Sequence, residues 1–168
     1  EGLFQYQIDH QTVPLPEDPW GHYVHLKQVD RNAAYLWLAQ INNGVPLQQV
    51  RAWAEQAVAA KPLPVFAEKI EIIKKLKSLE VEIYIVTASI KWAVEPGARR
   101  LGLTNEQVIG IETTVENGLV TDRQKGLITW REGKPQALLQ HTGGIHPYFA
   151  AATPKAICGY LKRLPICA

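Results

Sequence analysis

The N-terminal third of the chain has its apolar residues at helical spacing. From Asn32 to Ile41 they fall on most faces of a helix, which predicts a buried helix. From Leu47 to Ala60 they recur every three or four residues, which predicts a helix with one apolar face: Leu47, Val50, Trp53, Ala54, Ala57 and Val58. The glycine and proline of 42–46 separate the two helices. We therefore expect residues 1–62 to form a helical region without a strong strand.

After residue 62 the pattern changes to alternating strands and helices. Pro62 and Pro64 predict an extended link, since proline disfavours helix in the residue before it. Asn117-Gly118, between two alternating runs, predicts a hairpin with a two-residue turn. The elements expected in chain order are helix 68–79, strand 81–86, helix 91–101, strand 108–111, hairpin 113–121, helix 133–141 and strand 146–151. Residues 63–168 are thus expected to form an α/β unit with a parallel sheet.

The most informative segment is 81–89, a β-branched and aromatic run that ends in small hydroxylic residues. Buried parallel strands have such runs, and ligands of these sheets collect at the carboxyl ends of the strands. We therefore expect a turn at Thr87, Ala88 and Ser89 whose hydroxyl and N–H groups hold an anion the size of phosphate. The alternative is a buried strand followed by an ordinary turn.

Segment 87–97, with 108–111 and Gly133-Lys134, resembles the haloacid dehalogenase (HAD) phosphatase superfamily, and within it the phosphoserine-phosphatase-like hydrolases. The resemblance covers residues 1 to about 151 and makes 1–62 similar to that branch's helical cap. The fold it implies is a HAD-like Rossmannoid parallel sheet, incomplete here, with a β-hairpin. It gives Thr87 the role of phosphate ligand and Lys134 that of neutralising the phosphate. The alternatives are a strand-end cap for Thr87 and a solvated lysine for Lys134.

The resemblance also implies an activity, a cofactor and a partner. They are hydrolysis of a phosphomonoester through an aspartyl phosphate, Mg²⁺ held by carboxylates, and a small phosphorylated metabolite as substrate. Yet the family's Asp-x-Asp-x-Thr motif, with the nucleophile and the acid/base, is absent, and none of the four aspartates fits it: Asp9, Asp18, Asp30 and Asp122. The chain also contains no Met. We therefore expect a fragment whose first strand lies upstream and which is inactive by itself. The alternative is a pseudoenzyme that binds phosphorylated metabolites or a partner.

The end of the chain departs from the family as well. After 146–151 the family has Gly-Asp/Asn-x-x-x-Asp, whose acidic residues hold Mg²⁺, and this sequence has none there. A reading frame shifted by one base near Ala151 permits the missing motif, so we expect residues 152–168 to result from a frameshift. The alternative is a genuine tail with one apolar helical face. The nucleotide sequence of the gene decides between them.

The composition of the chain limits which classes of protein it can belong to. The chain has 168 residues, 46% of them hydrophobic and 20% charged, which suits one domain with a small insertion. Its net charge of +2 is too small to imply nucleic acid, and no stretch reaches the roughly twenty apolar residues of a membrane span. We expect neither partner, and a cytoplasmic location. Cys158 and Cys167 both lie in the tail and predict no disulfide or metal site. A nucleotide-binding domain lacks support because G-x-G-x-x-G and P-loop motifs are absent.

Several other clusters have a structural interpretation. His22 and His25 lack a third ligand and are expected to pack rather than to bind a metal. Arg99 and Arg100 are expected on the exposed side of their helix, and the lysines of 74–77 on a solvated helix face. Three aromatic residues of the helical region are expected to form its core, the alternative being a cage for a quaternary ammonium: Trp20, Tyr23 and Trp37.

Overall fold

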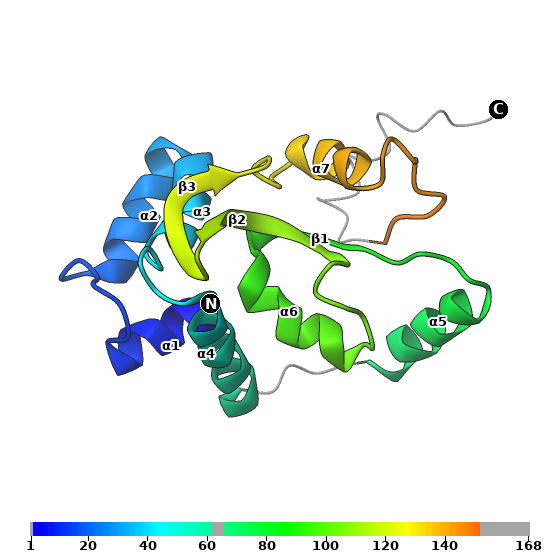
Figure 1. The fold of residues 1–168 in the computed structure, drawn as a ribbon, viewed down its shortest axis with the longest axis horizontal. Coiled ribbons are helices and arrows are strands. Elements are labelled where there is room, and N and C mark those ends of the chain that lie inside the picture. Colours follow the sequence, from blue (N-terminus) through cyan, green and yellow to red (C-terminus); the bar gives the residue numbers. More distant parts are fainter. Residues whose placement is uncertain (1, 62–65, 152–168) are drawn as a thin grey trace.

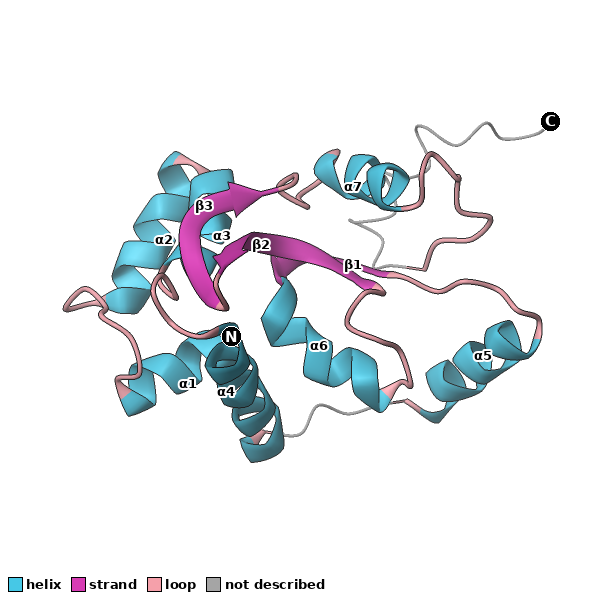
Figure 2. Cartoon of the chain, viewed as in Figure 1, coloured by secondary structure: helices cyan, strands magenta, loops and turns pink. Residues whose placement is uncertain are grey.

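The computed structural model describes residues 2–61 and 66–151. Figures 1 and 2 show a helical N-terminal half followed by a sheet with helices around it. The elements within these ranges are α1 (Gly2–His10), α2 (Pro19–Val29), α3 (Arg31–Gln40), α4 (Leu47–Ala60), α5 (Ala67–Ser78), β1 (Ile85–Ile90), α6 (Lys91–Arg100), β2 (Val108–Glu116), β3 (Leu119–Lys125) and α7 (Gly133–His141). None of these helices is long and apolar enough to cross a membrane.

The three strands form one sheet in the order β1-β2-β3. β1 and β2 are parallel and are connected through α6, while β2 and β3 form an antiparallel hairpin. Its turn is Asn117-Gly118, and both residues have positive φ, 51° and 81°, as a type I′ turn requires. The predicted hairpin is confirmed, and its first strand continues the parallel strand that was expected to end at residue 111.

Alternating side chains of β1 and β2 face helices on opposite sides of the sheet. Ile85 and Val108 pack in a cluster with Ala98 of α6. Their neighbours in sequence, Val86 and Ile109, pack instead with α7, against Ala137 and Leu138. Since successive side chains of a strand point to opposite faces, α6 and α7 cover opposite faces of the sheet (Figure 1).

The N-terminal helices share a hydrophobic core with the sheet. Leu3, Ala39, Val50 and Ala54 from α1, α3 and α4 form one cluster with four residues of the α/β part: Ile90, Trp92, Val120 and the partly buried Ala93. α3 contacts all three strands, and α4 packs along α6. The division into a cap at 1–62 and a core at 63–168 stays a prediction, and one core spans the two.

A buried ion pair joins α4 to α6. Arg51 donates Nε–H to one carboxylate oxygen of Glu95 at 2.7 Å and Nη2–H to the other at 2.9 Å. The Glu95 side chain is completely buried, while that of Arg51 is 34% exposed. This bidentate bond raises the pKa of Arg51 above its already high ordinary value, which keeps the guanidinium charged.

Arg99 and Arg100 are exposed on α6, as predicted, and both also contact α4. Arg99 pairs with Glu55, one turn further along both helices than the buried pair, and Arg100 reaches the carbonyl of Val58 at 3.5 Å. The lysines of 74–77 are exposed on α5, as predicted. Helical periodicity identified the helix but not its neighbour, because packing between helices is a tertiary property.

The five helices whose bounds were predicted, α3 to α7, were placed to within two residues, but two of the predicted strands, 81–86 and 146–151, were not. β1 begins at Ile85 rather than at residue 81 and extends beyond residue 86 to Ile90. Residue 85 lies opposite Val108, where β2 begins, so the preceding residues have no partner strand among those described. Residues 146–151 form no strand: Pro147 has no N–H to donate, and Tyr148 is fully exposed.

Replacing Arg51 by alanine should destabilise the fold by about 3 kcal/mol, because it leaves the buried Glu95 carboxylate unpaired. The matched control is Arg99→Ala, which breaks a more exposed pair between the same helices and should cost at most about 1 kcal/mol. Urea unfolding of both variants measures the difference. Equal losses would show that burial of Glu95 adds nothing to this helix contact.

Replacing Thr113 by valine should stabilise the protein by about 1 kcal/mol. Thr113 is fully buried in β2, and its hydroxyl finds no hydrogen-bond partner among the described residues. Valine has nearly the same shape and removes the unpaired hydroxyl. A lower free energy of unfolding in urea would mean that the hydroxyl has a partner in solution.

Candidate functional site

Thr87 lies within β1, where the strand's pairing with β2 is irregular. The register is regular at Val86 and resumes at Ile90, with a shift between them. The Ser89 amide donates to the Thr87 hydroxyl oxygen at 3.1 Å. The expected turn at Thr87, Ala88 and Ser89 is therefore corrected: these residues belong to the strand, and a side-chain bond to the backbone two residues on disrupts its ladder. The Ser89 amide, expected to face an anion, is occupied by Thr87.

A glycine in the neighbouring strand permits this irregular end of β1. A Cβ atom at Gly110 would lie 2.9 Å from Lys91 Cα and 3.0 Å from the Ser89 carbonyl oxygen. Any side chain there would push the junction of β1 and α6 away from β2. Gly110 therefore fixes how closely the residues after Thr87 approach the centre of the sheet.

Lys134 reaches the same part of β1 from the start of α7. Its ammonium donates to the Val86 carbonyl oxygen at 3.3 Å. Burial of the side chain lowers the pKa of Lys134 from its ordinary value, because the charged form loses part of its hydration. The structure thus places the Lys134 ammonium on the backbone of the residue that precedes Thr87. The pairing of the two side chains around a ligand stays a prediction.

A compact turn precedes Lys134 and contacts the strand as well. Thr129 is only 1% exposed, and its hydroxyl donates to the Thr87 carbonyl oxygen. At the end of the turn, a Cβ atom on Gly133 would lie 1.9 Å from the Ile128 carbonyl oxygen. Only glycine fits that contact, so the turn closes tightly on itself just before Lys134.

The next side chain of this turn packs on the N-terminal helices. The Trp130 ring lies 5.4 Å from the ring of Tyr35 in α3. The guanidinium groups of Arg31 and Arg131 lie 5.8 Å and 5.5 Å from the centre of the same ring, within cation–π range. The turn is therefore held by β1 on one side and by α3 on the other.

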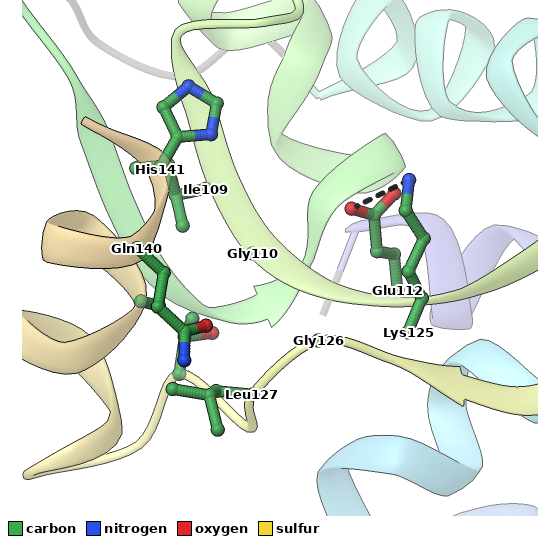
Figure 3. Close-up of a pocket in the computed structure, with 10 residues that line it drawn as sticks. Ile109, Gly110, Glu112, Lys125, Gly126, Leu127, Gln140 and His141 are labelled. Atoms are coloured by element: carbon green, nitrogen blue, oxygen red, sulfur yellow. Dashed lines mark ion pairs between the residues drawn. The ribbon is translucent and has the colours of Figure 1, made fainter. Parts of the chain in front are cut away.

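A pocket of about 230 Å³ lies beside this turn (Figure 3). Glu112 and Lys125 form its polar rim and pair at 3.4 Å. Thr129 borders it too, so one side chain touches both the pocket and the Thr87 carbonyl. The remaining lining residues are Ile109, Gly110, Gly126, Leu127, Ala137, Gln140 and His141.

The described residues do not fit a magnesium site. Nowhere in 2–61 and 66–151 do three or more His, Cys, Asp or Glu side chains gather closely enough to hold a metal ion. Two of the aspartates cap helices, Asp18 at α2 and Asp30 at α3, and Asp9 accepts from Gln5 on α1. Asp122 is exposed on β3. All four are thus accounted for away from Lys134.

The sequence was compared with known families and proteins. Residues 15–152 match a family described as haloacid dehalogenase-like hydrolase. The chain belongs to the haloacid dehalogenase-like hydrolase family. The superfamily expected from Thr87 and Lys134 is therefore confirmed for most of the chain.

The relatives of this HAD-family chain include an enzyme and two solved structures. Phosphorylcholine phosphatase of Pseudomonas aeruginosa PAO1 is 26% identical over 181 residues, which cover 88% of this chain and 50% of that enzyme. The chain thus spans half the length of this relative. A protein of unknown function from Bordetella pertussis Tohama I shares the fold, with a TM-score of 0.61 at 18% identity over 85% of this chain and 66% of its own. A phosphoserine phosphohydrolase-like protein from Francisella tularensis SCHU S4 has a TM-score of 0.46 at 11% identity over 88% of this chain and 68% of its own.

The aromatic residues of the N-terminal helices pack around a buried phenylalanine. Phe4 is 6% exposed and lies 4.9 Å from Trp20, 6.0 Å from Tyr23 and 5.6 Å from Trp37, between ring centres. His22 packs on Trp37 at 4.9 Å. The geometry agrees with the core-packing interpretation, since Phe4 occupies the space that a quaternary ammonium would need.

Sequence reasoning about the HAD site missed Thr129 and Gly110. Thr129 sits in a segment without hydrophobic periodicity, and no motif distinguishes it from other threonines. Gly110 interrupts an apolar strand, and an isolated glycine in such a run signals a close backbone approach. That signal was present in 108–111 and could have pointed to the contact with Lys91.

Titration of the Lys134 side chain by NMR should give a pKa below the ordinary lysine value of about 10.4. The unfolded chain then keeps this proton to higher pH than the folded protein does. The free energy of unfolding should therefore rise with pH between the folded and unfolded pKa values of this group. A pKa at or above the ordinary value would contradict the half-buried position of the ammonium.

Proposed function

We propose that Thr87 and Lys134 hold the phosphate group of a small phosphomonoester, in a chain related to phosphatases of the phosphoserine-phosphatase-like branch. The contact of Lys134 with the Val86 carbonyl carries the proposal, because it holds an ammonium on the backbone next to Thr87 although the two residues are far apart in sequence. No carboxylate of the described residues pairs with Lys134. Its charge is therefore available to an anion.

The chemistry of the two side chains suits a phosphate. The Thr87 oxygen accepts from the Ser89 amide, so its O–H can still donate to a phosphate oxygen. The Ala88 amide is the remaining backbone donor of the predicted set. A half-buried ammonium forms stronger charge-assisted bonds than one in water, and stabilising the equatorial oxygens is most of what phosphoryl transfer asks of a protein.

We further propose that this chain by itself binds phosphomonoesters without hydrolysing them. In the family an aspartate attacks phosphorus and Mg²⁺ supports the reaction, but no described aspartate pairs with Lys134 and no described cluster fits the metal. The residues of this chain therefore support binding and orientation of the phosphomonoester, but not its hydrolysis. A natural pseudoenzyme would also bind phosphomonoesters without hydrolysing them. The core that the N-terminal helices share with the sheet supports this alternative, because a pseudoenzyme needs a stable fold.

The proposed ligand class is a small phosphorylated metabolite. One relative is named a phosphorylcholine phosphatase, which makes phosphorylcholine the first ligand to try, with phosphoserine beside it. The aromatic residues around Phe4 add no argument for choline, because they pack on one another. Nucleic acid is not proposed as a partner at a net charge of +2, and a cytoplasmic location stays a prediction.

Binding of inorganic phosphate, phosphorylcholine and phosphoserine should be measurable by calorimetry on the 168-residue chain. Lys134→Ala should weaken phosphate binding at least about tenfold, the value of a lost charge-assisted hydrogen bond. Lys69→Ala, at an exposed position of α5, is the matched control and should bind as the unmodified chain does. Equal affinities in the two variants would exclude Lys134 as the phosphate ligand.

Assays with the same esters and Mg²⁺ should release no phosphate. Magnesium-dependent turnover by this chain, abolished in Lys134→Ala, would overturn the proposed absence of catalysis while keeping the proposed phosphate site.

A further inference from the structure

Two successive carbonyl groups of β1 accept hydrogen bonds from side chains at the start of α7 and in the turn that precedes it. Val86 accepts from the Lys134 ammonium at 3.3 Å, and Thr87 accepts from the Thr129 hydroxyl. Val86 is the last residue before the register with β2 shifts, and Thr87 follows it directly. The carbonyls thus find donors in the chain segment that carries the proposed phosphate lysine.

The backbone between the two donors is tightly folded. The Gly133 amide donates to the Trp130 carbonyl at 2.9 Å, and the Lys134 amide donates to the Arg131 carbonyl at 3.1 Å. Arg131 adopts a left-handed conformation with φ 48°, which a non-glycine residue takes only where its surroundings hold it. With Gly133 pressed on the Ile128 carbonyl, the position of Thr129 determines where α7 begins and hence where Lys134 lies.

Burial makes the Thr129 contact specific. The side chain is 1% exposed, so the loss of its hydrogen bond would leave a nearly buried acceptor without this donor. Removing the hydroxyl would leave the Thr87 carbonyl short of a donor. By contrast, the Lys134 side chain is long and half-buried, and it has many rotamers that point away from β1. An anchor close to its backbone reduces that freedom.

We infer that Thr129 is a positioning residue for the phosphate site, fixing the turn against β1 so that the Lys134 ammonium stays beside Thr87. Thr129 acts through Lys134 and Thr87 and touches no substrate. The inference deepens the proposed function and rests on it for the phosphate, but the placement of Lys134 can be measured without any ligand.

Three variants test this role. Thr129→Val removes the hydroxyl and keeps the shape, Thr129→Ser keeps the hydroxyl, and Thr113→Val makes the same change at a buried threonine whose hydroxyl has no described partner. For each variant we would measure the dissociation constant for inorganic phosphate, the Lys134 pKa by NMR without ligand, and the free energy of unfolding.

Thr129→Val should weaken phosphate binding about fivefold, the equivalent of one neutral hydrogen bond, and return the Lys134 pKa toward its ordinary value. Thr129→Ser should restore both quantities, and Thr113→Val should leave both unchanged. A loss of stability alone, with unchanged phosphate affinity and Lys134 pKa, would overturn the role, as would failure of serine to restore them. If the unmodified chain binds no phosphate but Thr129→Val still shifts the Lys134 pKa, the proposed function fails and the positioning role holds.

Discussion

The candidate phosphate site depends on two side-chain hydrogen bonds, from the start of α7 and the turn before it, to successive carbonyl groups of β1. Val86 and Thr87 are linked by side-chain hydrogen bonds to Lys134 and Thr129, residues more than forty positions away in sequence. Without these contacts α7 would still cover its face of the sheet through Ala137 and Leu138, but the Lys134 ammonium would lose its partner on β1. Hydrophobic packing thus holds α7 on the sheet, and the hydrogen bond to Val86 holds the Lys134 ammonium at β1.

The rest of the fold supports this attachment from two sides. The buried bond of Arg51 to Glu95 holds α4 on α6, the helix that begins directly after β1. Trp130 packs on Tyr35 of α3, which itself contacts all three strands. The N-terminal helices therefore contribute to the scaffold of the candidate site.

Sequence patterns predicted what depends on local periodicity. α4 was placed from residue 47 to residue 60 because its apolar residues follow one helical face, and the hairpin because Asn117-Gly118 suits its turn. The bounds of β1 were wrong because pairing with β2 decides them, and that contact is not local. Thr87 and Lys134 were found through their family motif. Thr129 was not predicted, since nothing in the sequence shows which carbonyl group a buried hydroxyl will donate to.

The most direct test of the account is an NMR titration of the unmodified chain with inorganic phosphate. It should shift the Lys134 side-chain signal and the amide signals of Thr87 and Ala88, the groups proposed to contact the phosphate. The Ser89 amide should shift with them, because it donates to the Thr87 hydroxyl. Shifts confined to Glu112 and Lys125 at the rim of the neighbouring pocket, or no shifts at all, would contradict the assignment of the phosphate site to Thr87 and Lys134.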